Sequence, residues 1–426
     1  MSNTKRRVIE WIKIAAIVLL TVSAVLLGWR TQLFNDIVRH IPLFGNVAEL
    51  VAGAAEPTLT LEAARPLIIV ITDENGVRHG VKYDTAMRNT VYDRTSGIVG
   101  EALGSAAEPI ELTEDEWRAA LSWAGVYFEY IMPVRLSVLD GWLGVRMTEC
   151  AWNREVRRIF VAFGEDTNRL YFQEFESGRF FGADTASRAQ ELGRDGLSRV
   201  EFAFETDVRA AEFAPYMLIF PQNHHPVLRA ANTVGLKQLD NLLSAFGIMG
   251  QNTHSQVDDD GTHTEIGPNF SIRIEPHGRV VYRRTDIVPE MEQLPGESEM
   301  IERARVIAAE TIGRYADEAE VFFERIDQSA ENVFAVMFGY YVAGGRVHLF
   351  EEGYAARITF SSGTVTEAEL FFRGFETIEG ERVSLLPALQ ALAAAGGEFM
   401  LAYSYVGNER FEPIWVRHEL EGSGGR

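Results

Sequence analysis

The chain has 426 residues, and its 61 acidic side chains outnumber 40 basic ones to give a formal net charge of −21 at pH 7. Residues 1–30 hold five basic side chains and one acid, a net of +4, so residues 31–426 carry −25. A surface this negative repels phosphate backbones and anionic headgroups, which argues against nucleic acid as a partner. The length suits two or three domains.

Residues 12–29 form an apolar run that has no equal elsewhere in the chain. At about 1.5 Å per residue, a helix of this length spans roughly 27 Å, close to a bilayer core of about 30 Å. The basic residues Lys5, Arg6, Arg7 and Lys13 lie at its N-terminal end, whereas only one basic residue closely follows it. The positive-inside rule therefore places the N-terminus in the cytoplasm and the bulk of the chain outside.

A cleaved secretory signal is the alternative interpretation of this run. Such a signal has an apolar region of about 7–15 residues that ends at small side chains. The run instead ends at Gly28 and is followed by the bulky Trp29 and the charged Arg30, where a peptidase needs small residues. We therefore expect an uncleaved signal-anchor, which makes the protein a single-pass protein of the cell membrane.

The predicted membrane helix contains a small-xxx-small pair, Ala24 and Gly28, with Ala16 and Leu20 on the same stripe. Small side chains let two helix backbones approach closely in lipid, where no hydrophobic force drives helices together. These four residues are the predicted contact face for a partner helix. The alternative is that the small-xxx-small pattern arises by chance, because Ala and Gly are common in membrane helices.

Cys150 is the only cysteine, so neither an intramolecular disulfide nor a thiolate metal cluster can form. An exported chain without disulfides fits a Gram-positive cell surface. Cys150 lies in a strand-like segment, and we expect a small buried hydrophobic residue there rather than a nucleophile.

Local signals along the chain alternate between hairpins and helices. Residues 73–76 (DENG) predict a tight turn between two strands, and Asp84 predicts the cap of a helix. Thr113 and Glu116 have the spacing of a capping box at the start of a second helix. Residues 298–315 have the periodicity of a third, amphipathic helix.

Composition and periodicity divide the chain into segments. The predicted segments are a cytoplasmic N-terminus (1–11), a transmembrane helix (12–29), a juxtamembrane stalk (30–60), a first extracytoplasmic domain (61–197), a second (198–285), a linker (286–297), a C-terminal domain (298–420) and a disordered tail (421–426). The predicted strands form antiparallel hairpins and do not alternate with helices in β-α-β units, which predicts the α+β class. The expected fold is one transmembrane helix followed by two or three extracytoplasmic domains of antiparallel sheet with packed helices.

Histidines are the first candidates for metal or acid–base chemistry. His224 and His225 are adjacent, and adjacent side chains point apart on an extended backbone, so the pair is not expected to chelate one ion. A surface loop is the favoured interpretation.

His254 and His263 flank an acidic run at 258–261 (DDDG) that suggests a calcium or zinc site. An EF-hand register would need acids where the chain has Gln256 and Gly267, so that interpretation fails. A charged hairpin turn flanked by two histidines on opposite strands accounts better for the pattern.

The sequence contains no GxSxG, HExxH, GxGxxG or P-loop motif. Acidic pairs are frequent, but an acidic chain produces them by chance. We predict that the protein is not an enzyme and has no catalytic, metal or cofactor site; it carries no cofactor.

The C-terminal segment, about residues 320–418, resembles the closing domain of the YycH/YycI (WalH/WalI) family. The resemblance comprises an aromatic strand followed by a glycine turn, an IxFxxGxV hairpin, a helix and an ending near PxW. The matching residues are Tyr341, Gly345, Val347, Ile358, Phe360, Gly363, Val365, Pro413, Trp415 and, one position away, Val416. The order of a short basic N-terminus, one membrane helix and a large exterior is also similar.

The resemblance implies a non-enzymatic, membrane-anchored regulator of a cell-envelope two-component system. Its expected partners are a sensor histidine kinase and a paralogous accessory membrane protein. Two alternatives remain open: a tethered binding protein for cell-wall fragments, and a PepSY-like inhibitor of a surface hydrolase.

Overall fold

The computed structural model of the chain describes residues 61–147, 152–190, 192–233, 239–248, 253–286, 294–349 and 353–417. The predicted membrane helix, with Ala16, Leu20, Ala24 and Gly28, lies outside these residues, as does Cys150. Within the described ranges, no helix is both long enough and apolar enough to cross a bilayer. All of these residues belong to one compact unit of the chain.

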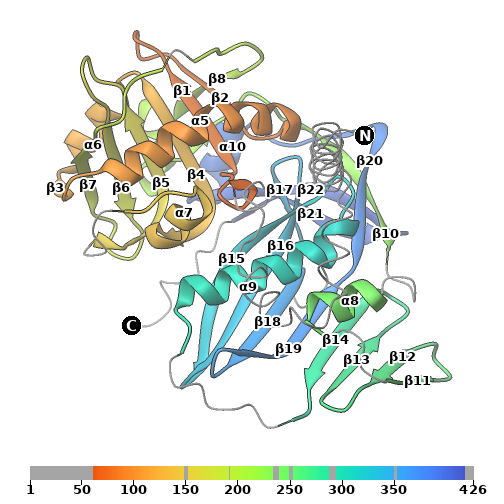
Figure 1. Cartoon of the computed structure of the whole chain (residues 1–426). Helices are drawn as coiled ribbons and strands as arrows, with labels where there is room; N and C mark the ends of the chain where they lie inside the picture. Colours follow the sequence, from red (N-terminus) through yellow and green to blue (C-terminus); the bar gives the residue numbers. More distant parts are fainter. Residues whose placement is uncertain are drawn as a thin grey trace, which may run out of the picture. The chain divides into compact units, whose positions relative to one another are not determined.

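An antiparallel sheet of nine strands organises the N-terminal part of the described chain (Figure 1). Its order is β3-β7-β6-β5-β4-β1-β2-β8-β9. The strands are β1 (Ile68–Thr72), β2 (Arg78–Val81), β3 (Ile110–Leu112), β4 (Gly125–Arg135), β5 (Glu155–Ala162), β6 (Arg169–Glu174), β7 (Phe180–Asp184), β8 (Ser198–Phe202) and β9 (Leu218–Ile219).

Both faces of this sheet are buried at its central strand β1, which explains why four consecutive apolar residues begin that strand. Ile69 and Ile71 pack in the same apolar cluster as the helix α5 (Thr85–Ser105). Ile68 lies on the opposite face, in a second cluster with Trp117 of the helix α6 (Glu114–Ala120). Successive side chains of a strand point to opposite faces, so a strand covered on both sides needs apolar residues at every position.

A second sheet has thirteen strands among the described residues, in the order β11-β12-β13-β14-β19-β18-β16-β17-β21-β22-β10-β20, with β15 paired to β16. All neighbours are antiparallel except β17 and β21. The strands are β10 (His224–Asn232), β11 (His254–Val257), β12 (His263–Ile266), β13 (Phe270–Ile274), β14 (Arg279–Arg284), β15 (Glu320–Ala330), β16 (Val333–Val342), β17 (Gly345–Val347), β18 (Ala356–Ser361), β19 (Thr364–Phe371), β20 (Arg373–Ser384), β21 (Phe399–Gly407) and β22 (Arg410–Arg417).

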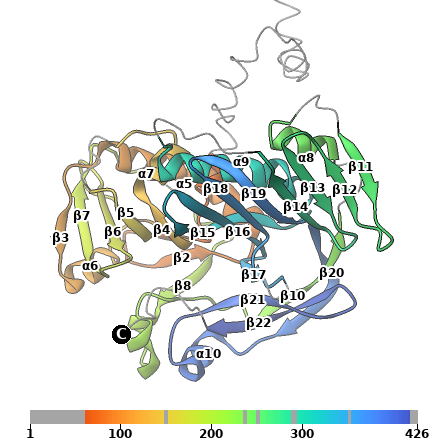
Figure 2. The ribbon, with the colours of Figure 1, turned by 90° about the horizontal axis from the view of Figure 1, so that it is seen from below.

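Helices pack on this sheet, and helix α9 (Glu297–Glu310) lies across β15, β16 and β18 (Figures 1 and 2). Mostly antiparallel sheet with packed helices confirms the α+β class. The remaining helices of the described chain are α7 (Leu136–Trp142), α8 (Leu239–Ala245), α10 (Ala388–Ala395) and the 3₁₀ turns η3 (Ala203–Glu205), η4 (Arg209–Phe213) and η6 (Ile312–Tyr315).

The predicted helix caps are confirmed. The Asp84 carboxylate accepts a hydrogen bond from the Met87 amide at 2.9 Å and begins α5. The Thr113 hydroxyl accepts from the Glu116 amide at 3.3 Å, and the Glu116 carboxylate accepts from the Thr113 amide at 2.7 Å. Two amides that have no partner inside α6 are thereby satisfied, as the capping-box spacing predicts.

The predicted turns are also present. Asp73 accepts from the amides of Asn75 and Val77, both at 2.9 Å, and Gly76 takes the left-handed conformation (φ 76°) that the turn between β1 and β2 requires. The DDDG segment likewise joins β11 to β12, with Gly261 at φ 84°.

Strand pairing runs across two of the predicted domain boundaries. β8 and β9, which follow residue 197, pair within the N-terminal sheet. β14 pairs with β19, so the segments on either side of residues 286–297 share one sheet. Sequence patterns locate strands but not their distant partners, because pairing depends on contacts between residues far apart in the chain.

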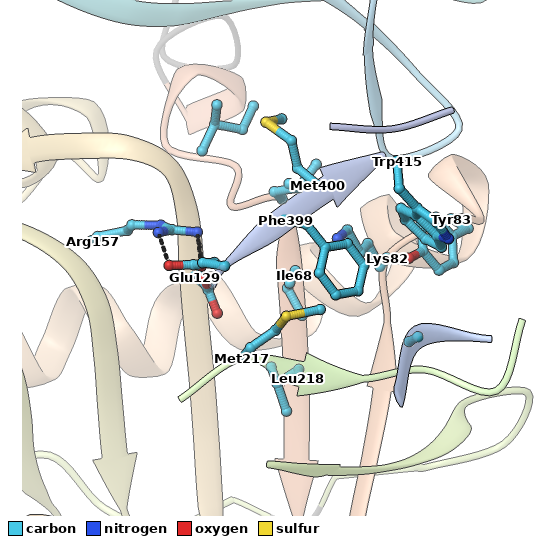
Figure 3. Close-up of a pocket in the computed structure, with 14 residues that line it drawn as sticks. Ile68, Lys82, Tyr83, Glu129, Arg157, Met217, Leu218, Phe399, Met400 and Trp415 are labelled. Atoms are coloured by element: carbon cyan, nitrogen blue, oxygen red, sulfur yellow. Dashed lines mark hydrogen bonds and ion pairs between the residues drawn. The ribbon is translucent and has the colours of Figure 1, made fainter. Parts of the chain in front are cut away.

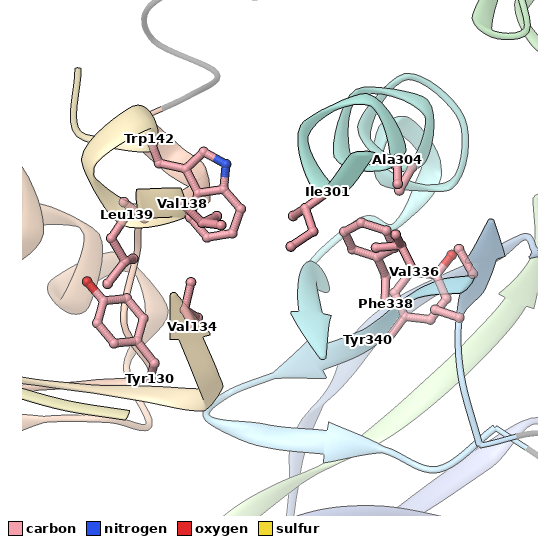
Figure 4. Close-up of a cluster of buried hydrophobic side chains, with 14 of the residues drawn as sticks. Tyr130, Val134, Val138, Leu139, Trp142, Ile301, Ala304, Val336, Phe338 and Tyr340 are labelled. Carbon is pink, nitrogen blue, oxygen red and sulfur yellow. The ribbon is translucent and has the colours of Figure 1, made fainter. Parts of the chain in front are cut away.

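The two sheets share a continuous apolar cluster (Figure 4). Trp142 of α7 packs edge-to-face on Phe323 of β15 at 6.3 Å between ring centroids. Its indole N–H donates to the Glu302 carboxylate of α9 at 3.0 Å. Ile301 of α9 belongs to the same cluster and lies between α7 and β16. Burial of these large side chains joins the N-terminal sheet to the second one.

Candidate functional site

The four histidine candidates lie in three strands of the second sheet. His224 is exposed and His225 is buried, so the two side chains point apart as the sequence predicts, but the pair begins strand β10 and does not lie in the expected surface loop. His254 lies opposite Ile266 in the β11–β12 hairpin, whereas His263 lies opposite Val257, so the two histidines are not paired across it. Within the described ranges, no three His, Cys, Asp or Glu side chains gather closely enough to hold a metal ion.

A buried ionic cluster lies where the two sheets meet, and we call Glu129, Arg157, Arg158, Glu398 and Lys82 the junction cluster. Glu129, Arg157, Arg158 and Lys82 are each less than a tenth exposed. Arg157 approaches a Glu129 oxygen at 2.9 Å and binds both oxygens of Glu398 at 2.6 and 3.0 Å. Arg158 approaches the same two carboxylates at 3.4 and 3.2 Å.

A β-bulge explains how two consecutive arginines bind the same acids. Neighbouring residues of a regular strand point to opposite faces. The pairing of β5 with β6 shifts register between Val156 and Arg158, which leaves an extra residue on β5. Such a bulge re-aims the side chains next to it. Arg157 and Arg158 both reach Glu398, which immediately precedes β21 of the second sheet.

Sequence reasoning missed this cluster. The signal was present, because two adjacent arginines interrupt the apolar residues that follow Glu155 in the strand EVRRIFVA. The acid that they bind lies about 240 residues further along the chain. No spacing rule connects residues so far apart.

Lys82 directly follows β2 and lines a small cavity of about 30 Å³ in the junction (Figure 3). Glu129, Arg157 and Glu398 contribute to the polar end of this cavity. Burial lowers the pKa of the Lys82 ammonium to about 8, against the opposing effect of the Glu129 carboxylate. The apolar lining is supplied by Leu67, Ile68, Ile131, Met217, Leu218, Ala388, Phe399 and Met400.

The hairpin turn between β16 and β17 packs closely against the backbone of Lys82. Gly344 has φ 73°, and a Cβ atom placed there would lie 2.7 Å from the Lys82 carbonyl oxygen. Glycine is therefore required at this turn, both for its left-handed backbone and for the close approach. The turn belongs to the second sheet and Lys82 to the N-terminal one, so the two sheets touch through backbone as well as side chains.

A larger cleft of about 910 Å³ lies on the other side of Tyr83, which lines both spaces. Its lining contains six carboxylates and two arginines, an excess of four negative charges when the histidines are neutral. The acids are Asp84, Asp317, Glu318, Glu320, Glu379 and Glu381, and the arginines are Arg65 and Arg382. This acidic cleft is within the size range of ligand sites.

An ion pair between a buried arginine and a half-buried glutamate also joins the sheets at this cleft. Arg88 of α5 is 1% exposed and binds Glu320, the first residue of β15. His225 also lines the cleft, with its ring edge-on to Tyr83 at 4.7 Å and to Trp415 at 5.6 Å. Burial and the nearby Lys82 and Arg382 charges lower the pKa of His225 to about 4.

Comparison with known proteins identifies the fold. No protein-family profile matches the sequence, and no curated protein matches it either. Among solved structures, YycH from Bacillus subtilis is similar with a TM-score of 0.52 and 11% sequence identity. The match covers 84% of this chain and 94% of that one. This chain has a YycH-like fold.

The residues that carry the sequence resemblance lie in the second sheet. Tyr341 is the penultimate residue of β16, and Gly345 begins β17 next to the junction. The predicted IxFxxGxV hairpin is the β18–β19 pair, with Gly363 at φ 76° in its turn. Trp415 lies in β22, and its indole N–H donates to the Leu386 carbonyl at 2.8 Å.

The replacement Glu398→Gln tests the junction cluster. It keeps the side chain's size but leaves two buried guanidinium groups with one carboxylate fewer. We expect a loss of about 3 kcal/mol in the free energy of unfolding, because removing one partner of a buried ion pair leaves charge uncompensated. Glu412→Gln is the control, since Glu412 pairs with Arg410 at 3.1 Å on the surface and is expected to contribute less than about 1 kcal/mol. Equal losses in thermal unfolding of the two variants would contradict this role.

His225 predicts a dependence of stability on acid pH. Its pKa is about 4 in the folded chain and 6.5 as the unperturbed value. As pH falls from 6.5 to 4, the unfolded chain therefore binds the proton first and stability falls, by about 1–3 kcal/mol in total. His225→Gln should make this decline shallower, whereas His224→Gln, at the exposed neighbouring residue, should not. Unfolding midpoints measured between pH 7 and 4 check this, and identical pH profiles for all three proteins would rule it out.

Proposed function

We propose that this protein is a non-enzymatic, membrane-anchored regulator of a sensor histidine kinase in a cell-envelope two-component system. The observation that carries the proposal is the YycH-like fold over 84% of the chain. The C-terminal motif resemblance and the predicted signal-anchor at residues 12–29 support it independently. In this proposal the N-terminus is cytoplasmic and residues 30–426 are extracytoplasmic.

The mechanism that we propose is a shift of the kinase between two states. A regulator shifts such an equilibrium only if it contacts the two states differently, with a coupling of typically about 1–3 kcal/mol. The membrane helix would supply one set of contacts, and the exterior would supply another. A paralogous accessory membrane protein would be a further partner.

A second candidate is a tethered binding protein for cell-wall fragments. The acidic cleft favours it, because a concave space of about 910 Å³ is large enough for a ligand. Native mass spectrometry of the purified chain would detect a fragment that copurifies. A specific adduct that is lost when the cleft is altered would favour this candidate over the regulator.

Deletion of the gene tests the regulator proposal. We expect transcripts of the kinase-controlled genes, such as cell-wall hydrolase genes, to change severalfold, because a coupling of about 1–3 kcal/mol corresponds to roughly 5–150-fold in an equilibrium. Complementation with a chain carrying an unrelated membrane helix should restore less of the effect than the native chain. Unchanged output from every kinase-controlled gene would refute the proposal.

The double replacement Ala24→Leu and Gly28→Leu tests the predicted helix contact. Leucine keeps the segment hydrophobic enough to insert but blocks close backbone approach. We expect a loss of about 1–2 kcal/mol in helix association, up to roughly tenfold in complex population. A bacterial two-hybrid assay with the kinase measures it, with membrane level as the control. A native signal from the double variant would identify the small-xxx-small pattern as chance.

A further inference from the structure

The junction cluster carries an unbalanced charge. It contains the cations Lys82, Arg157 and Arg158 and the carboxylates Glu129 and Glu398, an excess of one positive charge. This excess is unexpected in a chain of net charge −21. A buried charge without a counter-charge is costly, so structures normally supply a partner for it.

The two carboxylates are already engaged with the arginines. One oxygen of Glu129 faces both arginines, and the other accepts a hydrogen bond from the Tyr127 hydroxyl at 3.0 Å. Both oxygens of Glu398 accept from Arg157. Arg158 also donates through Nη1 to the Gln173 side-chain oxygen at 3.2 Å, and its buried Nε has no hydrogen-bond partner among the described residues. Arg157 further donates through Nε to the Tyr130 carbonyl at 3.4 Å.

Lys82 is the member of the cluster without a partner. It is 8% exposed, and its ammonium forms no hydrogen bond or ion pair with the described residues. Its near neighbours are the Tyr83 ring, whose centroid lies 5.2 Å from Nζ, and the charges of Glu129, Arg157 and Glu398. His225 also faces it, but burial holds the pKa of that imidazole at about 4, so it is neutral at pH 7. Three N–H donors therefore remain available on Lys82.

The cavity beside Lys82 sets the size of the missing partner. Its volume of about 30 Å³ exceeds the ~10–15 Å³ that one water molecule needs. It is far smaller than the space that a sugar or a peptide would need. Phe399 and Met217 line its apolar side (Figure 3). A metal cation is disfavoured by the positive excess, and a water molecule would leave that excess uncompensated.

We propose that this cavity binds a small monovalent anion, a carboxylate group or a halide ion, which pairs with the Lys82 ammonium. One negative charge neutralises the cluster, and the apolar side accommodates a methyl-sized substituent of a carboxylate. The proposal does not depend on the regulator function. Residues of both sheets line the cavity, so its occupancy is coupled to the contact between the sheets.

The first experiment measures the Lys82 ammonium directly in the full chain. The protein has four lysines, so labelling lysine with ¹³C at Cε gives a simple spectrum, and Lys82→Arg assigns the signal. The pKa of Lys82 is measured in sodium acetate, sodium chloride and sodium gluconate at one ionic strength, gluconate being too large for the cavity. An anion that binds the protonated form raises this pKa, by about one unit at ten times its dissociation constant.

The result distinguishes the sources of the anion. A higher pKa in acetate alone identifies a carboxylate site, and a higher pKa in chloride as well identifies a general monovalent-anion site. Equal values in all three salts would mean that water alone fills the cavity, and this result would overturn the proposal. An ordinary pKa near 10.5 in gluconate would overturn it too, because the ammonium would then be solvated.

The second experiment follows thermal stability and uses a matched control. The unfolding temperature of the native chain should rise by a few degrees in acetate or chloride relative to gluconate. Lys82→Met should abolish this dependence. Arg199→Met, which removes one charge at an exposed position of β8, should retain it. Retention of the anion effect in Lys82→Met would refute the site, and if Lys82→Met fails to fold, the pKa measurement on the native chain still decides.

Discussion

The contact between the two sheets depends on the pairing of Glu398 with two arginines from the other sheet. Taking these charges out of water is expensive, and their mutual attraction offsets the cost only when the geometry of the ion pairs is good. The bulge in β5 supplies that geometry by turning Arg157 and Arg158 toward the same carboxylate. Such a cluster contributes less to net stability than to a single, defined arrangement of the sheets.

The apolar part of the same contact supplies the stability. Trp142 and Ile301 bury large side chains between α7 and α9, and Trp142 also satisfies its indole N–H at Glu302. The buried Arg88 adds a second ion pair with the half-buried Glu320. Apolar burial is non-directional, whereas ion pairs are directional. The combination resists separation of the sheets and specifies how they are arranged.

Charge is distributed unevenly in this molecule. The chain is strongly acidic, and the acidic cleft continues that character beside Tyr83. On the other side of Tyr83 the junction cluster carries a positive excess. The two environments shift the pKa values of Lys82 and His225 downward for the same main reason, which is burial of a group that would be charged. Both groups lie at the contact between the sheets.

Local features of this chain are determined by the sequence itself. The cap at Asp84, the capping box of Thr113 and Glu116, and the turn at residues 73–76 each depend on residues within four positions of one another, and all were predictable. The α+β class followed from the same local patterns. The membrane helix predicted at residues 12–29 also rests on one continuous segment, and it remains a prediction because it lies outside the described residues.

Long-range features were decided by the tertiary structure. The pairing of β14 with β19, and the addition of β8 to the N-terminal sheet, depend on which distant strands meet. The junction cluster brings Lys82 and Glu398 to one cavity from opposite ends of the described chain. Local helix and strand propensities do not predict these long-range contacts, because burial and charge compensation act between residues that only the complete fold brings together.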